Sequence, residues 1–269
     1  MPQVTVEMCL IGNAFIGVER YATPILISKA DSGAKLTKLT EKTLFWVSKP
    51  VVNTYADTML DMDVHQKSPF PAGAKIIAPN HPSTNDPFFV ASMLGHQTHI
   101  LIKDVLFNVP VLGAYLKHSG HIKVAAGHGQ EAIDRALELL KAGKTIMIFP
   151  EGKVSPLAGG YNSVRSGVAR LAIASGAPVY PVGIHIVKDR IRPIQSTVKG
   201  EREMGYWYLR GPYNITVGKP LRFSGDVEDH DHVHEVARQV MLKIMRLAYE
   251  SEQRWYRRTG SVPGALETT

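Results

Sequence analysis

The chain has 269 residues but only one cysteine, Cys9, and it has no long apolar run. A single thiol cannot form an internal disulfide, and this scarcity suits a reducing compartment. A helix that crosses a bilayer needs roughly 18–20 consecutive apolar residues, and no stretch of the sequence reaches that length. The apolar run from Met8 to Val18 contains Asn13 and has no basic leader. We therefore expect neither a membrane-spanning helix nor a secretory signal.

Three common catalytic motifs are also missing. The sequence has no G-x-S-x-G elbow, which argues against a serine hydrolase, and no Cys-x-x-Cys or His-Glu-x-x-His zinc motif. The run from Asp229 to His234 is rich in histidine and aspartate, but such a run is typical of a solvated loop that leads into a helix. We predict no metal site.

Basic residues outnumber acidic ones, 31 to 24, giving a formal net charge of +7. This excess favours an anionic partner, which is a nucleic acid, a phosphate-bearing substrate or a membrane surface. The basic C-terminal cluster of Arg254, Arg257 and Arg258 is equally consistent with a solvated helix end. No recognised nucleic-acid-binding motif is present, so we expect lipid rather than nucleic acid.

Residues 1–61 differ from the rest of the chain. Apolar residues three and four positions apart predict a helix over 40–60, with a kink or a division into two helices at Pro50. Lysines lie around this segment. It is either an interfacial membrane anchor or a helix packed on the following domain.

Strand and helix patterns alternate over residues 62–260, and residues 261–269 read as a flexible tail. This alternation predicts an α/β domain with a central, mostly parallel sheet flanked by helices. The predicted strands are 75–78, 99–102, 121–124, 145–149, 179–187 and 213–218. The predicted helices are 87–94, 130–142, 164–175 and 234–257.

The segment from Asn80 to Asp86 contains a His-x-x-x-x-Asp pattern directly after a predicted strand. A carboxylate at Asp86 can hold one ring nitrogen of His81, which leaves the other nitrogen to act as a general base toward a substrate hydroxyl. The alternative for Asp86 is a helix cap, because Pro87 follows it.

A second group of residues, Phe149-Pro150-Glu151-Gly152, follows the apolar strand 145–149. Ligands of open α/β sheets bind at the carboxyl ends of strands. Lys153 and Arg165 follow in a glycine-containing loop that is suited to holding a phosphate, or that is an ordinary solvated loop.

These segments together resemble the lysophospholipid and glycerol-3-phosphate acyltransferase family. Its Asn-His-x-x-x-x-Asp block matches Asn80, His81 and Asp86, and its Phe-Pro-Glu-Gly block matches 149–152. Its apolar block centred on a proline matches 179–182, around Pro181. The resemblance covers roughly residues 62–223, and matching blocks in the family's order are far more specific than any one of them.

The resemblance implies roles for individual residues. His81 would deprotonate the acceptor hydroxyl, and Asp86 would orient His81. Glu151 and Gly152 would bind the acceptor head group, and Pro181 would shape the acyl-donor site. Lys103 occupies the place of a lysine common between the first two blocks.

The sequence departs from the family at its second block, where Ala126 replaces the expected phosphate-binding arginine. Three residues are candidates for the missing charge: Lys123, Lys153 and Arg165. A lysine cannot reproduce the bidentate grip of an arginine. The resemblance implies acyl transfer to lysophosphatidic acid. Because Ala126 replaces the arginine, another lysolipid or a glycolipid is the alternative acceptor.

The expected co-substrate is acyl-CoA or acyl-carrier protein, with no metal or redox cofactor. The expected place is the cytoplasmic face of a membrane containing anionic lipid, where the protein is peripheral or monotopic. A rival motif, Gly127-His128-Gly129, fits a dinucleotide fingerprint and keeps an NAD-dependent oxidoreductase as a remote alternative.

Overall fold

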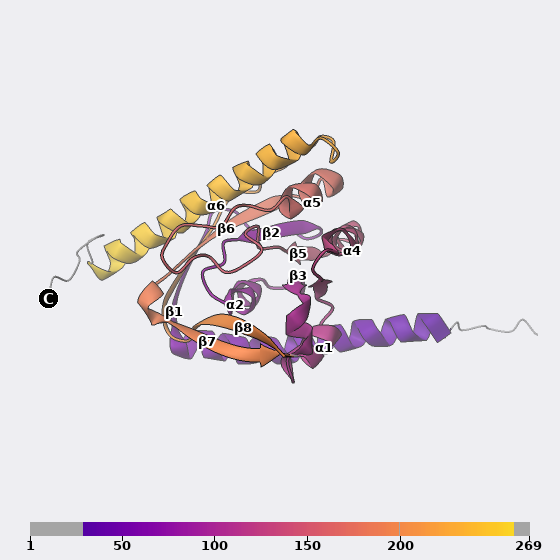
Figure 1. Cartoon of the computed structure of the whole chain (residues 1–269), viewed down its shortest axis with the longest axis horizontal. Helices are drawn as coiled ribbons and strands as arrows, with labels where there is room; N and C mark the ends of the chain where they lie inside the picture. The colour runs from indigo at the N-terminus through magenta and orange to yellow at the C-terminus, as the bar shows by residue number, and fades with distance from the viewer. Residues whose placement is uncertain (1–28, 199, 261–269) are drawn as a thin grey trace, which may run out of the picture.

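The computed structural model describes residues 29–198 and 200–260 (Figure 1). Predictions for residues 1–28 and for the tail at 261–269 lie outside the described residues. The helices are α1 (Lys29–Met59), α2 (Asp86–Met93), α3 (Leu112–His118), α4 (Gly129–Lys141), α5 (Gly167–Ser175) and α6 (His230–Thr259), with short 3-10 turns η1 (Asp104–Asn108) and η2 (Lys188–Arg190). The strands are β1 (Leu60–Gln66), β2 (Lys75–Pro79), β3 (Thr98–Lys103), β4 (Ile122–Val124), β5 (Thr145–Met147), β6 (Val179–Ile186), β7 (Ile191–Val198), β8 (Glu201–Tyr208) and β9 (Gly211–Val217).

Seven strands form one sheet in the order β1-β9-β6-β2-β5-β3-β4. All neighbouring pairs are parallel except β6 and β9. This confirms the predicted α/β fold with a mostly parallel sheet. Strand β1, helix α3 and the β7–β8 hairpin were not predicted from the sequence.

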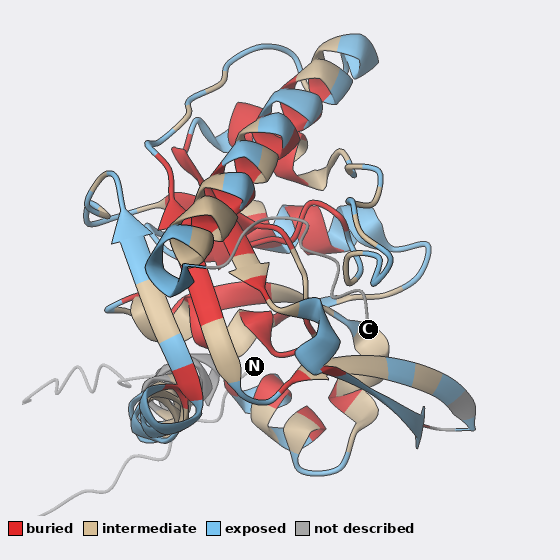
Figure 2. Ribbon diagram, turned by 90° about the vertical axis from the view of Figure 1, so that its left-hand side faces the viewer, coloured by how far each residue is buried: buried red, intermediate tan, exposed pale blue. Residues whose placement is uncertain are grey.

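Side chains alternate between the two faces of the sheet, as the pleat of a strand requires. In β2, Ile76 and Ala78 join the core on the face covered by α4, α5 and α6. Ile77 joins the core on the other face, with Phe89 of α2 and Ala56 of α1. Figure 1 shows α6 along one side of the sheet and α1 along the opposite side. In Figure 2, α6 is buried along its inner face and exposed along its outer face.

Helix α1 continues through Pro50, so the predicted division into two helices is wrong. Proline removes a single backbone donor, and Pro50 lies on the exposed side of the helix, where its ring displaces no packing. The inner side packs on α2, where the rings of Tyr55 and Phe89 stack with centroids 6.0 Å apart. No helix among the described residues has an apolar window long enough to cross a bilayer.

Candidate active site

The candidate site lies at the ends of two adjacent strands whose following connections pass to opposite faces of the sheet. Strands β2 and β5 are paired neighbours. After β2 the chain enters α2, which packs on one face of the sheet, and after β5 it continues to α5, which packs on the other. The carboxyl ends of strands that diverge in this way form the crevice in which open α/β sheets bind ligands. His81 follows β2 and Glu151 follows β5.

His81 and Asp86 meet in this crevice. His81 Nδ1 lies 3.0 Å from Asp86 Oδ2. Because a carboxylate can only accept, Nδ1 carries the proton and Nε2 keeps its lone pair. The imidazole stacks on Phe149 with ring centroids 4.2 Å apart, and its side chain keeps 15% of its surface exposed. The ring is therefore held from two directions, and Nε2 is the nitrogen available to a substrate.

The carboxylate of Asp86 is fully buried and accepts four hydrogen bonds. Besides His81, its partners are the Ser83 backbone N–H at 2.7 Å, the Ser83 hydroxyl at 2.5 Å and the Tyr213 hydroxyl at 2.8 Å. The alternative for Asp86, a helix cap, is wrong, because Asn85 is the N-cap of α2 and the Asp86 side chain accepts from Ser83 in the preceding loop. This set of donors stabilises the negative charge of the buried carboxylate.

Tyr213 was missed in the sequence because nothing links it to a residue 127 positions earlier except the fold. Strand β9 brings it beneath α2, where its ring meets Phe89 edge to face. Burial, and next the charge of Asp86, raise the pKa of Tyr213 well above its usual value. Tyr213 therefore stays protonated and donates to Asp86 throughout the physiological pH range.

We expect Tyr213→Phe to lower kcat roughly tenfold with little change in KM, because one of four donors to Asp86 is lost and a buried hydrogen bond contributes about 1 kcal/mol. Tyr208→Phe is the matched control, since its buried hydroxyl donates to the Pro212 carbonyl at 2.8 Å and not to Asp86. Steady-state kinetics of both variants tests the difference. Equal kcat values for the two would show that Tyr213 supports only the fold.

The loop from 80 to 85 is fixed by side-chain amides that imitate strand pairing. Asn80 donates to the Ile184 carbonyl at 2.9 Å and accepts from the Ile184 N–H at 2.7 Å. Asn85 makes the same pair of bonds with Tyr208 of β8, at 2.7 and 3.0 Å. Asn80, predicted to bind substrate, is thus buried with its amide engaged by β6. The β7–β8 hairpin, absent from the prediction, holds the other end of the loop.

Glu151 is 1% exposed, and its carboxylate joins the loop after β5 to the loop after β2. It accepts from the His81 backbone N–H at 3.1 Å and from the Ser155 hydroxyl at 2.7 Å. Asn162 donates to it from its backbone at 2.8 Å and from its side chain at 3.1 Å. Its predicted contact with an acceptor head group stays a prediction. In the structure, Glu151 fixes the backbone position of His81.

The other residues predicted to bind substrate surround the crevice. Gly152, Lys153 and Arg165 are exposed in the loop after β5. Gly152 has φ +68°, and a Cβ there would lie 2.5 Å from Arg165 Nε, so glycine lets the arginine side chain cross the backbone. Pro181 is buried within β6, opposite Gly218, whose N–H donates to its carbonyl at 2.9 Å.

Lys103 and Lys123 end up on neighbouring strands, both exposed near the carboxyl edge of the sheet. Lys123 pairs with Ile102 and Lys103 with Val124, so alternation directs the two lysines to opposite faces. Lys123 shares the face of Phe149, on which His81 stacks. The structure therefore does not bring the two lysines together.

The rival dinucleotide motif follows β4, the last strand at one edge of the sheet. A dinucleotide fingerprint follows a central strand at the switch point, so its glycines would need to lie after β2 or β5. Gly127 instead lies in an exposed turn, Gly129 is the first residue of α4, and His128 pairs with Glu131 at 2.8 Å. The oxidoreductase alternative is therefore wrong, because its motif follows an edge strand of the sheet.

A cavity of about 410 Å³ lies beside the loop that carries His81. Asn80 and Pro82 form one wall, and Ile184, Met245 and Ala248 contribute an apolar wall from β6 and α6. Tyr161 also lines it, and burial, followed by the charges of Glu151 and Glu252, raises its pKa to about 12. The cavity offers apolar surface next to the candidate dyad.

Comparison with known proteins identifies the region that contains these features. Residues 61–185 match the family model described as "Acyltransferase". A stretch of 106 residues is 29% identical to the chloroplastic 1-acyl-sn-glycerol-3-phosphate acyltransferase BAT2 of Brassica napus, covering 38% of this chain and 30% of that protein. The crystal structure of the 1-acyl-sn-glycerophosphate (LPA) acyltransferase PlsC from Thermotoga maritima aligns with TM-score 0.49 and 22% identity, over 81% of this chain and 83% of that one. The segment that carries His81, Asp86 and Glu151 is therefore similar to the acyltransferase family, over slightly less than half of the chain.

Proposed function

We propose that the chain transfers a fatty acyl group from an acyl thioester to the hydroxyl of lysophosphatidic acid, forming phosphatidic acid. The observation that carries this proposal is the pair of His81 and Asp86 at the switch point of the sheet, within the segment that matches the acyltransferase family. The names of the two similar proteins support the choice of acceptor.

In the proposed reaction, His81 Nε2 takes the proton of the acceptor hydroxyl as its oxygen attacks the thioester carbonyl carbon. The tetrahedral intermediate then collapses, the C–S bond breaks, and the imidazolium returns the proton to the departing sulfur. An ester and a free thiol result. Asp86 keeps the proton on Nδ1 and stabilises the imidazolium, as the carboxylate does in hydrolase triads. No serine or cysteine of the enzyme is acylated.

The donor is proposed to be acyl-CoA or acyl-carrier protein, with no metal or redox group taking part. The apolar wall of the cavity beside Asn80 and Pro82 is suited to a fatty acyl chain. For the acceptor phosphate, the exposed Lys153 and Arg165 lie on the loop that Glu151 ties to His81. Ala126 is exposed after β4 and offers no charge there.

The chain is further proposed to work as a peripheral or monotopic protein at the cytoplasmic face of a membrane. Its substrate and product are lipids, and its net charge of +7 favours an anionic surface. The outer face of α1 presents Trp46, Val47 and Val51, which are 65%, 64% and 68% exposed. Large apolar side chains on the solvent side of a helix are what an interfacial helix buries in lipid.

A panel of acceptors tests this function. Purified protein is incubated with a labelled acyl thioester and, separately, lysophosphatidic acid, lysophosphatidylcholine, monoacylglycerol and a glycolipid, and products are identified by mass spectrometry. We expect lysophosphatidic acid to give the highest kcat/KM. A higher value for a glycolipid or for another lysolipid would replace the proposed acceptor but keep the acyltransferase, whereas no acylated product from any acceptor would contradict the function itself.

A further inference from the structure

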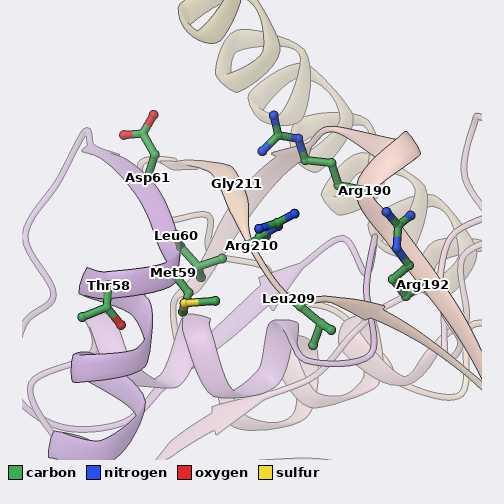
Figure 3. Close-up of a pocket in the computed structure, with 9 residues that line it drawn as sticks. All are labelled: Thr58, Met59, Leu60, Asp61, Arg190, Arg192, Leu209, Arg210 and Gly211. Carbon is green, nitrogen blue, oxygen red and sulfur yellow. The ribbon is translucent and has the colours of Figure 1, made fainter.

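A second cavity, of about 950 Å³, lies away from His81, at the start of β1 and β9 and the base of the β7–β8 hairpin (Figure 3). Because β9 runs antiparallel to β6, its first residue Gly211 lies at the carboxyl end of β6. The cavity is thus on the same edge of the sheet as the candidate dyad. Its charged lining consists of Arg190, Arg192, Arg210 and Asp61.

The three guanidinium groups are not neutralised by protein carboxylates. Asp61, the single acidic residue in the lining, already pairs with Arg258 of α6, at 2.6 and 3.2 Å. Among residues 29–198 and 200–260, no ion pair involves Arg190, Arg192 or Arg210. Three uncompensated arginines around one cavity repel one another unless an anion binds between them.

Contacts with the backbone restrain two of these arginines, Arg190 and Arg192. Gly211 has φ +118°, and a Cβ there would lie 2.6 Å from Arg190 Nη1 and 2.8 Å from the Tyr208 hydroxyl. Only glycine both adopts this conformation and leaves room for the Arg190 side chain. Arg192 is restrained as well, since it donates to the Asp189 carbonyl at 3.0 Å. Restrained guanidinium groups lose less entropy on binding and match the bidentate geometry of phosphate.

Apolar surface adjoins the arginines on one side. Met59 and Leu209 line the cavity, and each is 42% exposed. The Tyr55 hydroxyl donates to the Leu209 carbonyl, which joins α1 to the end of β8. Val47 and Val51, on the exposed side of α1, belong to the same helix as Met59, which lines the cavity. In Figure 3, Met59 and Leu60 lie on one side of the cavity, Arg190 and Arg192 lie on the other, and Arg210 lies between them.

We infer that the cavity binds the phosphate headgroup of an anionic membrane lipid, held by Arg190, Arg192 and Arg210, while Met59 and Leu209 contact the adjoining acyl region. The inference deepens the membrane association put forward in the proposed function. It adds a specific site, separate from the crevice of His81, that would orient the carboxyl edge of the sheet toward the bilayer. Buried Tyr208 and Tyr213 stand between this cavity and Asp86, so a membrane lipid and not the reacting acceptor is the occupant that fits.

The test measures binding of the full chain to phosphatidylcholine vesicles with and without phosphatidic acid, in the His81→Ala background and without an acyl donor. The test variant replaces Arg190, Arg192 and Arg210 with glutamine. The matched control replaces three exposed lysines at the opposite edge of the sheet with glutamine, Lys141, Lys144 and Lys219. Both variants lose the same charge, and circular dichroism checks that both are folded.

We expect the arginine variant to bind phosphatidic acid vesicles at least about tenfold more weakly, and the lysine variant less than about threefold more weakly, given the attraction of basic residues held at an anionic surface. Arg210→Gln alone, on the exposed turn after β8, is expected to give part of the loss. Equal losses in the two triple variants, or no loss in the arginine variant, would overturn the inference.

A second measurement distinguishes binding of the acceptor from binding of a membrane lipid. If the arginine variant with His81 intact raised KM for soluble short-chain lysophosphatidic acid and left vesicle binding unchanged, the cavity would be an acceptor site and the inference would be wrong. An unchanged KM together with weaker vesicle binding supports it. Because vesicle binding is measured without turnover, failure of the cavity site and failure of the proposed acyl transfer are distinguishable.

Discussion

Replacing His81 with alanine is expected to reduce acyl transfer by about 10²–10⁴-fold, the contribution of a positioned general base. The acceptor hydroxyl then has no group to take its proton, because Asp86 faces the buried Ser83 and Tyr213 and not the crevice. Folding should persist, since Asp86 keeps three of its four donors and Glu151 bonds the backbone N–H of residue 81, not its side chain.

The matched control for this variant is His128→Ala. His128 also places Nδ1 within 2.8 Å of a carboxylate, that of Glu131, but on the exposed start of α4. Its loss should leave kcat unchanged. Initial rates at saturating donor and acceptor give the comparison, and vesicle binding and thermal unfolding show whether the protein is otherwise intact. Near wild-type turnover by His81→Ala would rule out the proposed mechanism.

Asp86→Asn is expected to lower kcat by roughly 10²–10³-fold while the fold is kept. The asparagine oxygen can face the Ser83 N–H and His81 Nδ1, and its NH₂ can donate to the Ser83 and Tyr213 hydroxyls, which accept as readily as they donate. The geometry and the tautomer of His81 then survive. What is lost is the negative charge that stabilises the imidazolium as it forms.

Asp63→Asn controls for the removal of a paired carboxylate elsewhere. Asp63 pairs with Arg254 at 2.9 Å between β1 and α6, away from the crevice. We expect its kcat to match wild type. Measuring kcat and the free energy of unfolding for both variants distinguishes charge stabilisation from packing. If Asp86→Asn retained more than about a third of wild-type kcat, the carboxylate would serve only to place the ring.

Periodicity predicted six of the seven strands of the large sheet and missed β1. The strand 75–78 and the helix 130–142 correspond to β2 and α4, because a buried strand and an amphipathic helix leave distinct apolar patterns. The β7–β8 hairpin left no such pattern. Almost all of β7 is exposed, so few of its residues are selected for burial, and Pro193 within it argued against a strand.

The family blocks located the dyad but gave less information about what supports it. His81 and Asp86 are five residues apart, so their contact depends on one loop and one helix start. Tyr213 and Asn162 reach the same site from β9 and from the loop after β5, and only the assembled sheet brings them there. The sequence showed Glu151 as a candidate for substrate binding, and its burial beneath His81 could not be read from a linear pattern.

The cavity that the three arginines line could not be predicted from the sequence either. Arg190 ends η2, Arg192 lies in β7, Arg210 follows β8 and Asp61 lies in β1, so no local motif contains them. The net charge predicted an anionic partner but not where on the protein it would bind. The register of β1 with β9, which pairs Leu60 with Gly211, creates that place.

The central claim is that this chain moves an acyl group to a lipid hydroxyl by means of His81. The most direct measurement incubates the purified wild-type protein and His81→Ala with lysophosphatidic acid and an isotope-labelled acyl-CoA, and follows labelled phosphatidic acid and free thiol by mass spectrometry. The account predicts equal amounts of both products from the wild type and almost none from the variant. Labelled phosphatidic acid formed at equal rates by the two proteins would contradict it.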